Sequence, residues 1–575
     1  MKKPLQISLV IASFVFFAHT VFSQQISFAP NEVIVKFKSN VQDVQAQQTF
    51  ADAGLAQTSF ISQLGLYVCN ITNQASVQNA VAACRSDDNV EYAEPNYLVF
   101  LDRQSDDQVF PNDKRFKSLW GLHNRTDQDI DAPEAWAVQK GDKKVIVAVI
   151  DTGVDYDHQD LRDNMWRNPG ETGTDAEGKD KAKNKKDDDG NGFVDDVYGW
   201  NFQRGSNDPT DPHSHGTHVS GTIGAVGNNE KGIVGVNWQV SIMAMRFIAP
   251  TGSGTTDDAI KSIIYAVDNG AHILNNSWGS NQPSQALSDA IAYARDRNVI
   301  FVAAAGNDDR DTDLYAHYPS GYEHDNIISV AATDGSDSFA GFSNTGVKTV
   351  DLAAPGVAIL STTPNDGYSK FDGTSMAAPH VSGVAALVLG QYPGLTYRQV
   401  QTRMYGGVDY KSGYKRFLMT SGRLNAHKPL STNPLIAFVT DKKDTLDTEG
   451  PYLVQADAVD DVSIQSMTLF YTVNDGQAQS QNMQNSGGDT FSAGIPGQAR
   501  DAKISYYIEA TDNDGNKSQT PTSLFRIRQP GKGGCCGGPG VSVASAETPG
   551  EKAMVLFGNV FVLGMMVWGV GRIKK

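Results

Sequence analysis

Residues 373–380, Gly-Thr-Ser-Met-Ala-Ala-Pro-His, open a helix-forming run that continues to Leu389. Ser375 therefore stands on a tight turn before a helix N-terminus, where unpaired N–H groups and the positive end of the helix dipole favour a developing oxyanion. Pro379 falls near the start of the run, where a missing N–H costs little. Serine is also among the best N-cap residues, so this stretch alone does not separate a nucleophile from an ordinary cap.

Asp151 ends a second informative stretch. Residues 144–150 are a near-continuous β-branched run, typical of a strand buried on both faces of a parallel sheet. Open α/β sheets place their sites at the carboxyl ends of such strands. Asp151 is therefore either a turn residue or a carboxylate that orients a histidine.

Histidine is concentrated at 213–218, His-Ser-His-Gly-Thr-His, which holds three of the 11 histidines. A metal site would use His215 and His218, which share one helix face, but the His-Glu-x-x-His pattern of zinc hydrolases is absent from this stretch. General-base catalysis needs only one imidazole nitrogen that faces a serine. The spacing alone does not choose between His215 and His218.

The three stretches occur in the order Asp, His, Ser and closely resemble the motifs of the subtilisin-like serine peptidases, the subtilase family. The resemblance covers roughly residues 120–426 and implies a doubly wound, mostly parallel α/β sheet. It implies that Asp151 orients the histidine, that His215 acts as general base and then acid, and that Ser375 attacks the scissile carbonyl. His218 and His380 match family positions that are not catalytic.

The same resemblance implies an oxyanion donor and a substrate cleft. Residues 299–305 look like the strand that delivers an asparagine amide, here Asn307, and losing such a donor typically costs about 10²–10³ in turnover. Glycine suits the cleft walls because a backbone that pairs with substrate must be approached closely. Asp313 stands where the family has the floor of its first specificity pocket, which suggests Arg or Lys before the cut. The residues implied to bind an extended protein or peptide substrate are Gly252, Ser253, Gly254, Ser277, Trp278 and Gly279.

A charged insertion lies between Asp160 and Tyr198. Asp187, Asp189 and Asn191 reproduce the first half of an EF-hand-type loop, but Tyr198 replaces the closing glutamate. A solvated acidic loop is the alternative. Similar loops in the family bind calcium, which implies a structural Ca²⁺. Its expected ligands are Asp187, Asp189, Asn191, the Phe193 carbonyl, and Asp196 or Asp195. A second, weaker candidate site involves Asp160 and residues 228–229.

Length and charge limit the possible functions. A chain of 575 residues is expected to hold roughly three or four domains. Its formal charge of −17, from 48 basic and 65 acidic residues, argues against nucleic-acid binding, which needs a basic stripe. None of the four cysteines lies between residues 85 and 534. The central domain must therefore be stable without disulfides, which favours a bound metal.

Two segments precede the motifs. Residues 1–23 combine Lys2 and Lys3 with an apolar run, as a secretory signal peptide does, so we expect export. Residues 24–112 are expected to form a small α+β module and a charged linker, and they resemble the family's inhibitory propeptide. That resemblance implies a zymogen whose own propeptide is an intramolecular inhibitor, cut within residues 101–117. The module's expected strands are 32–37, 66–71 and 90–94, and its expected helices are 41–53 and 77–84.

We assign the peptidase domain to residues 113–432, and three further segments are expected after it. Residues 433–528 are predicted to form an all-β sandwich of immunoglobulin or fibronectin type, with strands at 436–439, 452–454, 464–473 and 504–510. Residues 529–552 are rich in glycine and predict a flexible linker. Residues 553–575 predict a C-terminal hydrophobic helix, because 553–570 carry no charge and approach the roughly 17–25 residues that a membrane span needs. A membrane anchor, a sorting tail and a buried helix remain open.

The sequence therefore predicts a secreted or surface-tethered serine endopeptidase. One alternative is an exported scaffold or adhesion protein with an inactive form of the same fold. Such a protein would be expected to lack one of Asp151, His215, Asn307 or Ser375, and all four are present. A second alternative, a metal-dependent hydrolase, would lose activity with a chelator and survive a serine-directed phosphonate.

Overall fold

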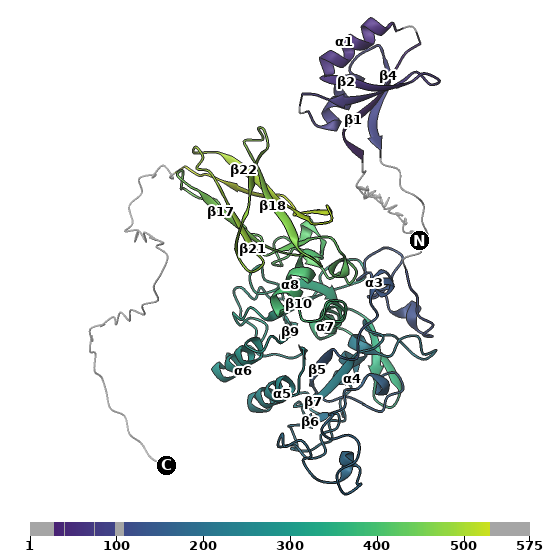
Figure 1. Ribbon diagram of the computed structural model, residues 1–575, viewed down its shortest axis with the longest axis vertical. Helices are drawn as coiled ribbons and strands as arrows, with labels where there is room; N and C mark the ends of the chain where they lie inside the picture. Colours follow the sequence, from purple (N-terminus) through teal and green to yellow (C-terminus); the bar gives the residue numbers. More distant parts are fainter. Residues whose placement is uncertain (1–27, 40, 74, 98–107, 530–575) are drawn as a thin grey trace, which may run out of the picture. The chain divides into compact units, whose positions relative to one another are not determined.

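The computed structural model describes residues 28–39, 41–73, 75–97 and 108–529 (Figure 1). The chain divides into two compact units, residues 1–108 and 109–575, and each is described by itself. The predicted signal peptide and the predicted C-terminal hydrophobic helix at 553–575 lie outside the described residues, as does the linker beyond Gln529. Among the helices within the described ranges, none is long and apolar enough to cross a membrane.

The N-terminal unit is an antiparallel sheet with the strand order β2-β3-β1-β4 and two helices packed on it. Val33, Val35 and Phe50 lie in its core. The sequence predicted each of these elements except β2, whose residues after Leu55 are exposed and lack the alternation of a half-buried strand. The elements are β1 (Phe28–Phe37), α1 (Asp43–Ala53), β2 (Leu55–Ile61), β3 (Leu66–Ile71), α2 (Val77–Arg85) and β4 (Val90–Tyr97).

The second unit is built on a nine-stranded sheet with the order β14-β15-β11-β10-β9-β8-β5-β7-β6. Every neighbouring pair is parallel except β14 and β15. This is the doubly wound, mostly parallel sheet that the sequence predicted. Its strands are β5 (Ile146–Asp151), β6 (Gly199–Asn201), β7 (Ser241–Arg246), β8 (Ile273–Asn276), β9 (Ile300–Ala304), β10 (Ile327–Thr333), β11 (Leu352–Pro355), β14 (Asp409–Tyr410) and β15 (Gly422–Arg423).

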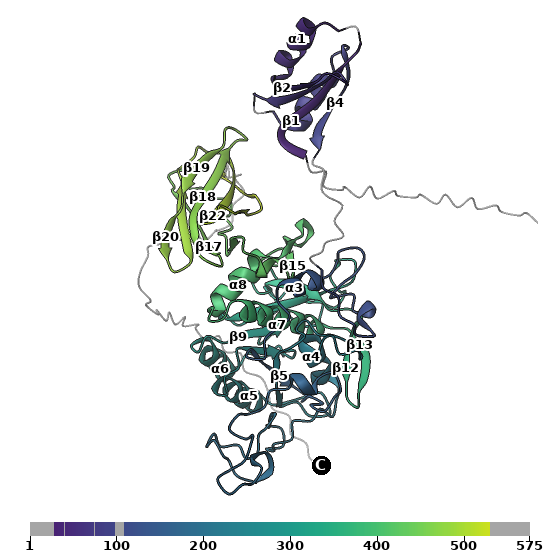
Figure 2. The ribbon, with the colours of Figure 1, turned by 45° about the vertical axis from the view of Figure 1, so that its right-hand side comes forward.

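Helices cover both faces of this sheet (Figures 1 and 2). Alternate residues of β5 point to opposite faces, so Val147 and Val149 pack with the helices α4 and α7 while Ala148 and Ile150 pack with α5 and α6. Burial on both faces explains why β5 reads as a continuous apolar run. The helices are α3 (Ala132–Val138), α4 (His215–Gly224), α5 (Thr256–Asp268), α6 (Gln285–Arg295), α7 (Thr374–Gln391) and α8 (Tyr397–Gly406).

Helix α7 is buried from Thr374 to Val388 apart from Ser375, so it crosses the core rather than lying on the surface. Pro379 lies inside this helix, beyond its first turn. This differs from the sequence expectation, which placed the proline where its missing N–H costs little. A proline at this position cannot donate the helical hydrogen bond to the carbonyl of Ser375, four residues earlier.

The C-terminal part of the second unit is rich in β structure and consists of two antiparallel sheets around one core. The strand β22 alternates strictly between half-buried and buried residues, as a strand of a sandwich does. On α8, Arg398 pairs with Asp457 of β17 at 2.8 Å and links this region to the parallel-sheet domain. The strands are β16 (Leu435–Ala437), β17 (Tyr452–Val459), β20 (Gln484–Gly487) and β21 (Thr490–Ile495) in one sheet, and β18 (Ile464–Val473), β19 (Gln479–Asn482), β22 (Lys503–Asp512), β23 (Lys517–Gln519) and β24 (Ser523–Arg526) in the other.

Candidate active site

Asp151 and His215 are in direct contact. Asp151 is fully buried at the carboxyl end of β5, and His215 is the first residue of α4. The imidazole Nδ1 lies 2.8 Å from Asp151 Oδ1 and 3.0 Å from Oδ2. Burial alone would lower the pKa of His215, but the adjacent Asp151 carboxylate outweighs it, so the pKa is raised above its ordinary value. The pair is thus arranged to hold one imidazole tautomer and to stabilise an imidazolium.

Asp211 is a further carboxylate at this site, which the sequence did not single out. It is 3% exposed and accepts five hydrogen bonds within 3.0 Å. Two of its donors, the hydroxyl groups of Thr152 and Thr217, follow Asp151 and His215 closely in the sequence. Asp211 therefore ties the end of β5 to the start of α4. Its negative charge also helps to raise the pKa of His215.

Ser375 lies at the start of α7 and is half-buried. Its Oγ donates a hydrogen bond to the carbonyl of Ser277 at 3.0 Å. Among the hydrogen bonds of the described residues, none joins Ser375 to His215, so the structure brings Asp151 and His215 together but leaves the serine hydroxyl turned to Ser277. Catalytic hydrogen bonds are often long or misaligned without substrate and tighten when it binds.

Ser277 in turn donates to Ser375. Its Oγ lies 2.9 Å from the main-chain carbonyl oxygen of Ser375, the group that Pro379 leaves without a helical donor. Ser277 is 3% exposed, so its hydroxyl provides this carbonyl with a hydrogen-bond donor that is shielded from solvent. The two serines are thus joined by reciprocal hydrogen bonds, which hold the cleft wall at 277–279 against the start of α7.

Asn307 follows β9 and is exposed. Its Oδ1 accepts hydrogen bonds from the backbone N–H and the hydroxyl of Thr374, both at 2.9 Å. Both bonds use the amide oxygen of Asn307, and its Nδ2 group has no hydrogen-bond acceptor among the described residues. A Cβ built on Gly373 would lie 3.7 Å from that Nδ2, so the amide nitrogen lies beside the residue that precedes Thr374 and Ser375.

The other two histidines of the motifs have packing roles. His218 is fully buried, stacks on Phe371, and its Nε2 lies 2.9 Å from the carbonyl of Ile359. Burial lowers the pKa of His218 to about 3 and that of His380 to about 4. Both are therefore neutral at ordinary pH.

The predicted substrate segments lie on either side of an aromatic contact. Gly252, Ser253 and Gly254 form an exposed turn, which the pairing of Gly254 with Ile248 holds at the end of β7. The ring of Phe247, beside Ile248, packs on Trp278 at 5.0 Å between centroids. Segments 252–254 and 277–279 are thus connected through these two rings.

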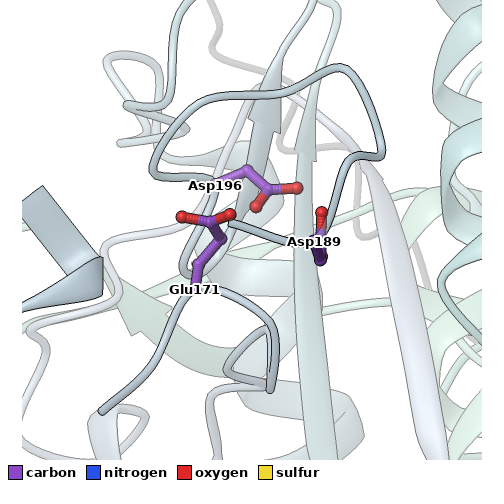
Figure 3. A group of neighbouring side chains, drawn as sticks. All are labelled: Glu171, Asp189 and Asp196. Atoms are coloured by element: carbon purple, nitrogen blue, oxygen red, sulfur yellow. The ribbon is translucent and has the colours of Figure 1, made fainter. Parts of the chain in front are cut away.

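Three carboxylates in the acidic insertion lie within 4.8 Å of one another: Glu171, Asp189 and Asp196 (Figure 3). Glu171 and Asp196 are fully buried, and Glu171 Oε2 has no partner among the described residues. No Lys or Arg of the described part of the chain forms an ion pair with any of the three, and burial raises the pKa of both Glu171 and Asp196 above the ordinary carboxyl value. Oxygen ligands of this kind suit Ca²⁺.

The predicted calcium ligands are therefore only partly brought together. Asp189 and Asp196 belong to the group, and the Asn191 amide donates to both. Asp187 lies outside it and accepts backbone N–H groups of residues 190–192. The ring of Phe193 packs on Tyr265, whose hydroxyl donates to Asp196. Glu171 was missed because it lies outside the repeating Asp-x-Asp-x-Asn pattern.

At the weaker second site, Asp160 is already well paired. Its carboxylate accepts from Asn229 Nδ2 at 3.0 Å, from the Ile233 N–H at 2.9 Å and from the Tyr368 hydroxyl at 2.7 Å. We make no assignment there.

Two family models match this chain. The model of the subtilase family, Peptidase_S8, matches residues 142–421, and the model of the fervidolysin N-terminal prodomain matches residues 20–96. The chain is 34% identical to a thermophilic serine proteinase of Bacillus sp. strain AK1, over 70% of this chain and 88% of that protein. It is 35% identical to thermitase of Thermoactinomyces vulgaris, over 55% of this chain and 98% of thermitase. Subtilisin-like protease 1 of Plasmodium falciparum is 34% identical over 50% of this chain, but the match spans only 43% of that protein.

Proposed function

Because this chain belongs to the subtilase family of serine proteases and carries an N-terminal prodomain, we propose that it is an exported endopeptidase that cuts extended segments of proteins with an Asp151-His215-Ser375 triad. The observation that carries the proposal is the contact of the buried Asp151 carboxylate with His215 Nδ1, because it leaves Nε2 free to serve the serine.

In the acylation step, Ser375 Oγ attacks the scissile carbonyl carbon while His215 Nε2 takes the hydroxyl proton. Asp151 stabilises the resulting imidazolium, and the carbonyl oxygen becomes an oxyanion. The side-chain amide of Asn307 donates to that oxyanion, because its own oxygen is committed to Thr374. The imidazolium then gives its proton to the leaving amine, and a water molecule completes the cycle by the same steps in reverse order.

The direct test uses the purified mature protein and denatured casein. We expect casein cleavage, its loss in Ser375→Ala, and stoichiometric labelling of Ser375 by a fluorophosphonate. Ser336→Ala, an exposed serine of the same domain, is the matched control and should cleave at the wild-type rate. Equal cleavage by the wild type and Ser375→Ala would exclude the triad and favour the inactive scaffold or a metal-dependent activity.

The prodomain supports synthesis as a zymogen that cuts itself. We place the cut within residues 101–117, a charged, proline-bearing stretch that follows the four-stranded unit in the sequence. Expressed alone, Ser375→Ala should remain at precursor size, and a trace of mature wild-type enzyme should convert it. Maturation of Ser375→Ala in a protease-free system would contradict self-processing.

The carboxylates Glu171, Asp189 and Asp196 support a structural calcium site, with Asn191 beside it. A Ca²⁺ ion held by these carboxylates would neutralise their mutual repulsion and so stabilise the insertion that carries them. Export through residues 1–23 and tethering through residues 553–575 rest on the sequence alone. Fractionation of cells that express the protein with and without residues 553–575 tests the tether, since only the full chain should stay with the membrane.

A further inference from the structure

The residue before the scissile bond must place its side chain between two segments, if the proposed function is correct. Ser375 Oγ is bonded to the backbone of Ser277 on one side, and Asn307 contacts Thr374 on the other. A carbonyl carbon attacked by Ser375 with its oxygen at Asn307 therefore lies between segments 277–279 and 305–307. The adjacent side chain enters the same gap.

Both segments present a glycine to this gap, and one imidazole contacts both glycines. A Cβ built on Gly279 would lie 2.2 Å from His317 Cε1 and 2.4 Å from Nε2. A Cβ built on Gly306 would lie 3.0 Å from the same Nε2. The edge of the His317 ring thus occupies the space that the absent side chain of Gly279 leaves open, and at Gly306 it shares that space with the Asn344 amide nitrogen, which would lie 2.4 Å from the built Cβ.

The ring is fixed in this position. His317 is 7% exposed, and its Nδ1 lies 2.9 Å from Ser320 Oγ. Two backbone hydrogen bonds, of 2.7 and 2.8 Å, pair the next residue, Tyr318, with Ser280. Burial lowers the pKa of His317, so the ring is neutral and does not provide a charged pocket.

Asp313, by contrast, does not face this gap with a free carboxylate. Its Oδ1 accepts from the backbone N–H of Lys348 and Thr349 at 3.0 Å and from the Thr349 hydroxyl at 2.8 Å. The suggested preference for Arg or Lys before the cut therefore loses its physical basis.

We propose that His317 closes the specificity pocket between Gly279 and Gly306, so that the enzyme cuts proteins after small residues, namely Gly, Ala and Ser. A larger side chain would have to displace a buried ring from a well-packed position, which overpacks the site. Since one methylene in an enzyme pocket already changes rates by about 10–200-fold, a branched or aromatic side chain is expected to be strongly disfavoured.

The test measures kcat/KM on quenched-fluorescence peptides that differ only in the residue before the cut, with each cut position identified by mass spectrometry. The wild type should cleave after Ala at least about tenfold faster than after Leu or Phe. His317→Ala should raise kcat/KM for Leu and Phe at least about tenfold, with a much smaller change for Ala. His317→Leu, which refills the space, should keep the small-residue preference. His324→Ala, a histidine bonded to Ser288 on α6, is the matched control and should leave the profile unchanged.

Wild-type cleavage after large or basic residues would overturn the inference, and so would an unchanged profile in a folded His317→Ala. If His317→Ala does not fold, the wild-type and His317→Leu profiles still decide, since both must favour small residues. Failure of the proposed function looks different: no peptide would then be cut in a Ser375-dependent manner. Ser375-dependent cleavage after large side chains would overturn the role of His317 alone.

Discussion

Ser277 Oγ donates to the main-chain carbonyl of Ser375, 2.9 Å away, where the helical donor is missing because residue 379 is proline. The cleft wall and the proposed nucleophile are therefore coupled through a hydrogen bond that the helix cannot make for itself. We expect Ser277→Ala to leave this carbonyl unpaired, at a cost of about 1–3 kcal/mol. In a Pro379→Ala background the restored N–H should take over, and the cost of Ser277→Ala should shrink.

A double-mutant cycle measures this coupling through the midpoint of thermal unfolding. All four proteins should carry Ser375→Ala, which prevents self-digestion and keeps the main-chain carbonyl at residue 375. Additive effects of Ser277→Ala and Pro379→Ala would show that the two residues act independently and would contradict the coupling.

Asp211 is predicted to position the triad and to tune His215. Asp211→Asn keeps the shape but loses a charge and part of its acceptor capacity, so kcat should fall by about 10–100-fold with little change in KM. Activity requires neutral His215, and it is lost as the pH falls through the raised pKa of this residue. Removing the Asp211 charge lowers that pKa, so the acidic limb of kcat/KM should move to lower pH.

Asp208→Asn is the matched control for this prediction. Asp208 belongs to the same loop but accepts hydrogen bonds from Thr210 and Tyr156. Removing its charge should therefore leave the acidic limb of the kcat/KM profile at the wild-type pH. A purely structural role for Asp211 would lower thermal stability without moving the limb.

Asn307 is predicted to act only on the transition state. Asn307→Ala should lower kcat by about 10²–10³ and leave KM nearly unchanged, because the amide bonds to the oxyanion and not to the ground-state substrate. Asn307→Asp should be at least as damaging, since a carboxylate repels the oxyanion. A change in KM without a change in kcat would place Asn307 in substrate binding instead.

The sequence predicted those features of the fold and the site that a local pattern of residues encodes. Buried strands such as β5 and β9 are recognisable in the sequence as apolar runs. The motifs at 151–153, 215–219 and 373–380 together predicted that Asp151, His215 and Ser375 belong to one site. Strand β2 was not predicted, because its side chains after Leu55 face solvent and its sequence therefore lacks an alternation of apolar and polar residues.

The features that the sequence did not predict depend on contacts between distant parts of the chain. Glu171 joins Asp189 and Asp196 across the insertion, and His317 reaches Gly279 from a separate loop. Neither Glu171 nor His317 lies in a periodic pattern or a recognisable motif, so nothing local distinguished it from an ordinary surface residue. Asp211 could have been noticed, because it precedes His215 by four residues, but an aspartate in a loop is usually a turn residue.

Calcium is predicted to stabilise the fold through Glu171, Asp189 and Asp196. An ion that binds only the folded state at 100 times its Kd adds about 2.7 kcal/mol, so EGTA should lower the unfolding midpoint of the Ser375→Ala protein and excess Ca²⁺ should restore it. Glu171→Gln removes one of the three charges and should reduce the response to Ca²⁺. Asp188→Asn is the matched control, because Asp188 lies in the same loop but outside the group and pairs with Asn184. A full calcium response in Glu171→Gln would show that the ion binds elsewhere, and no response in the parent protein would exclude the site.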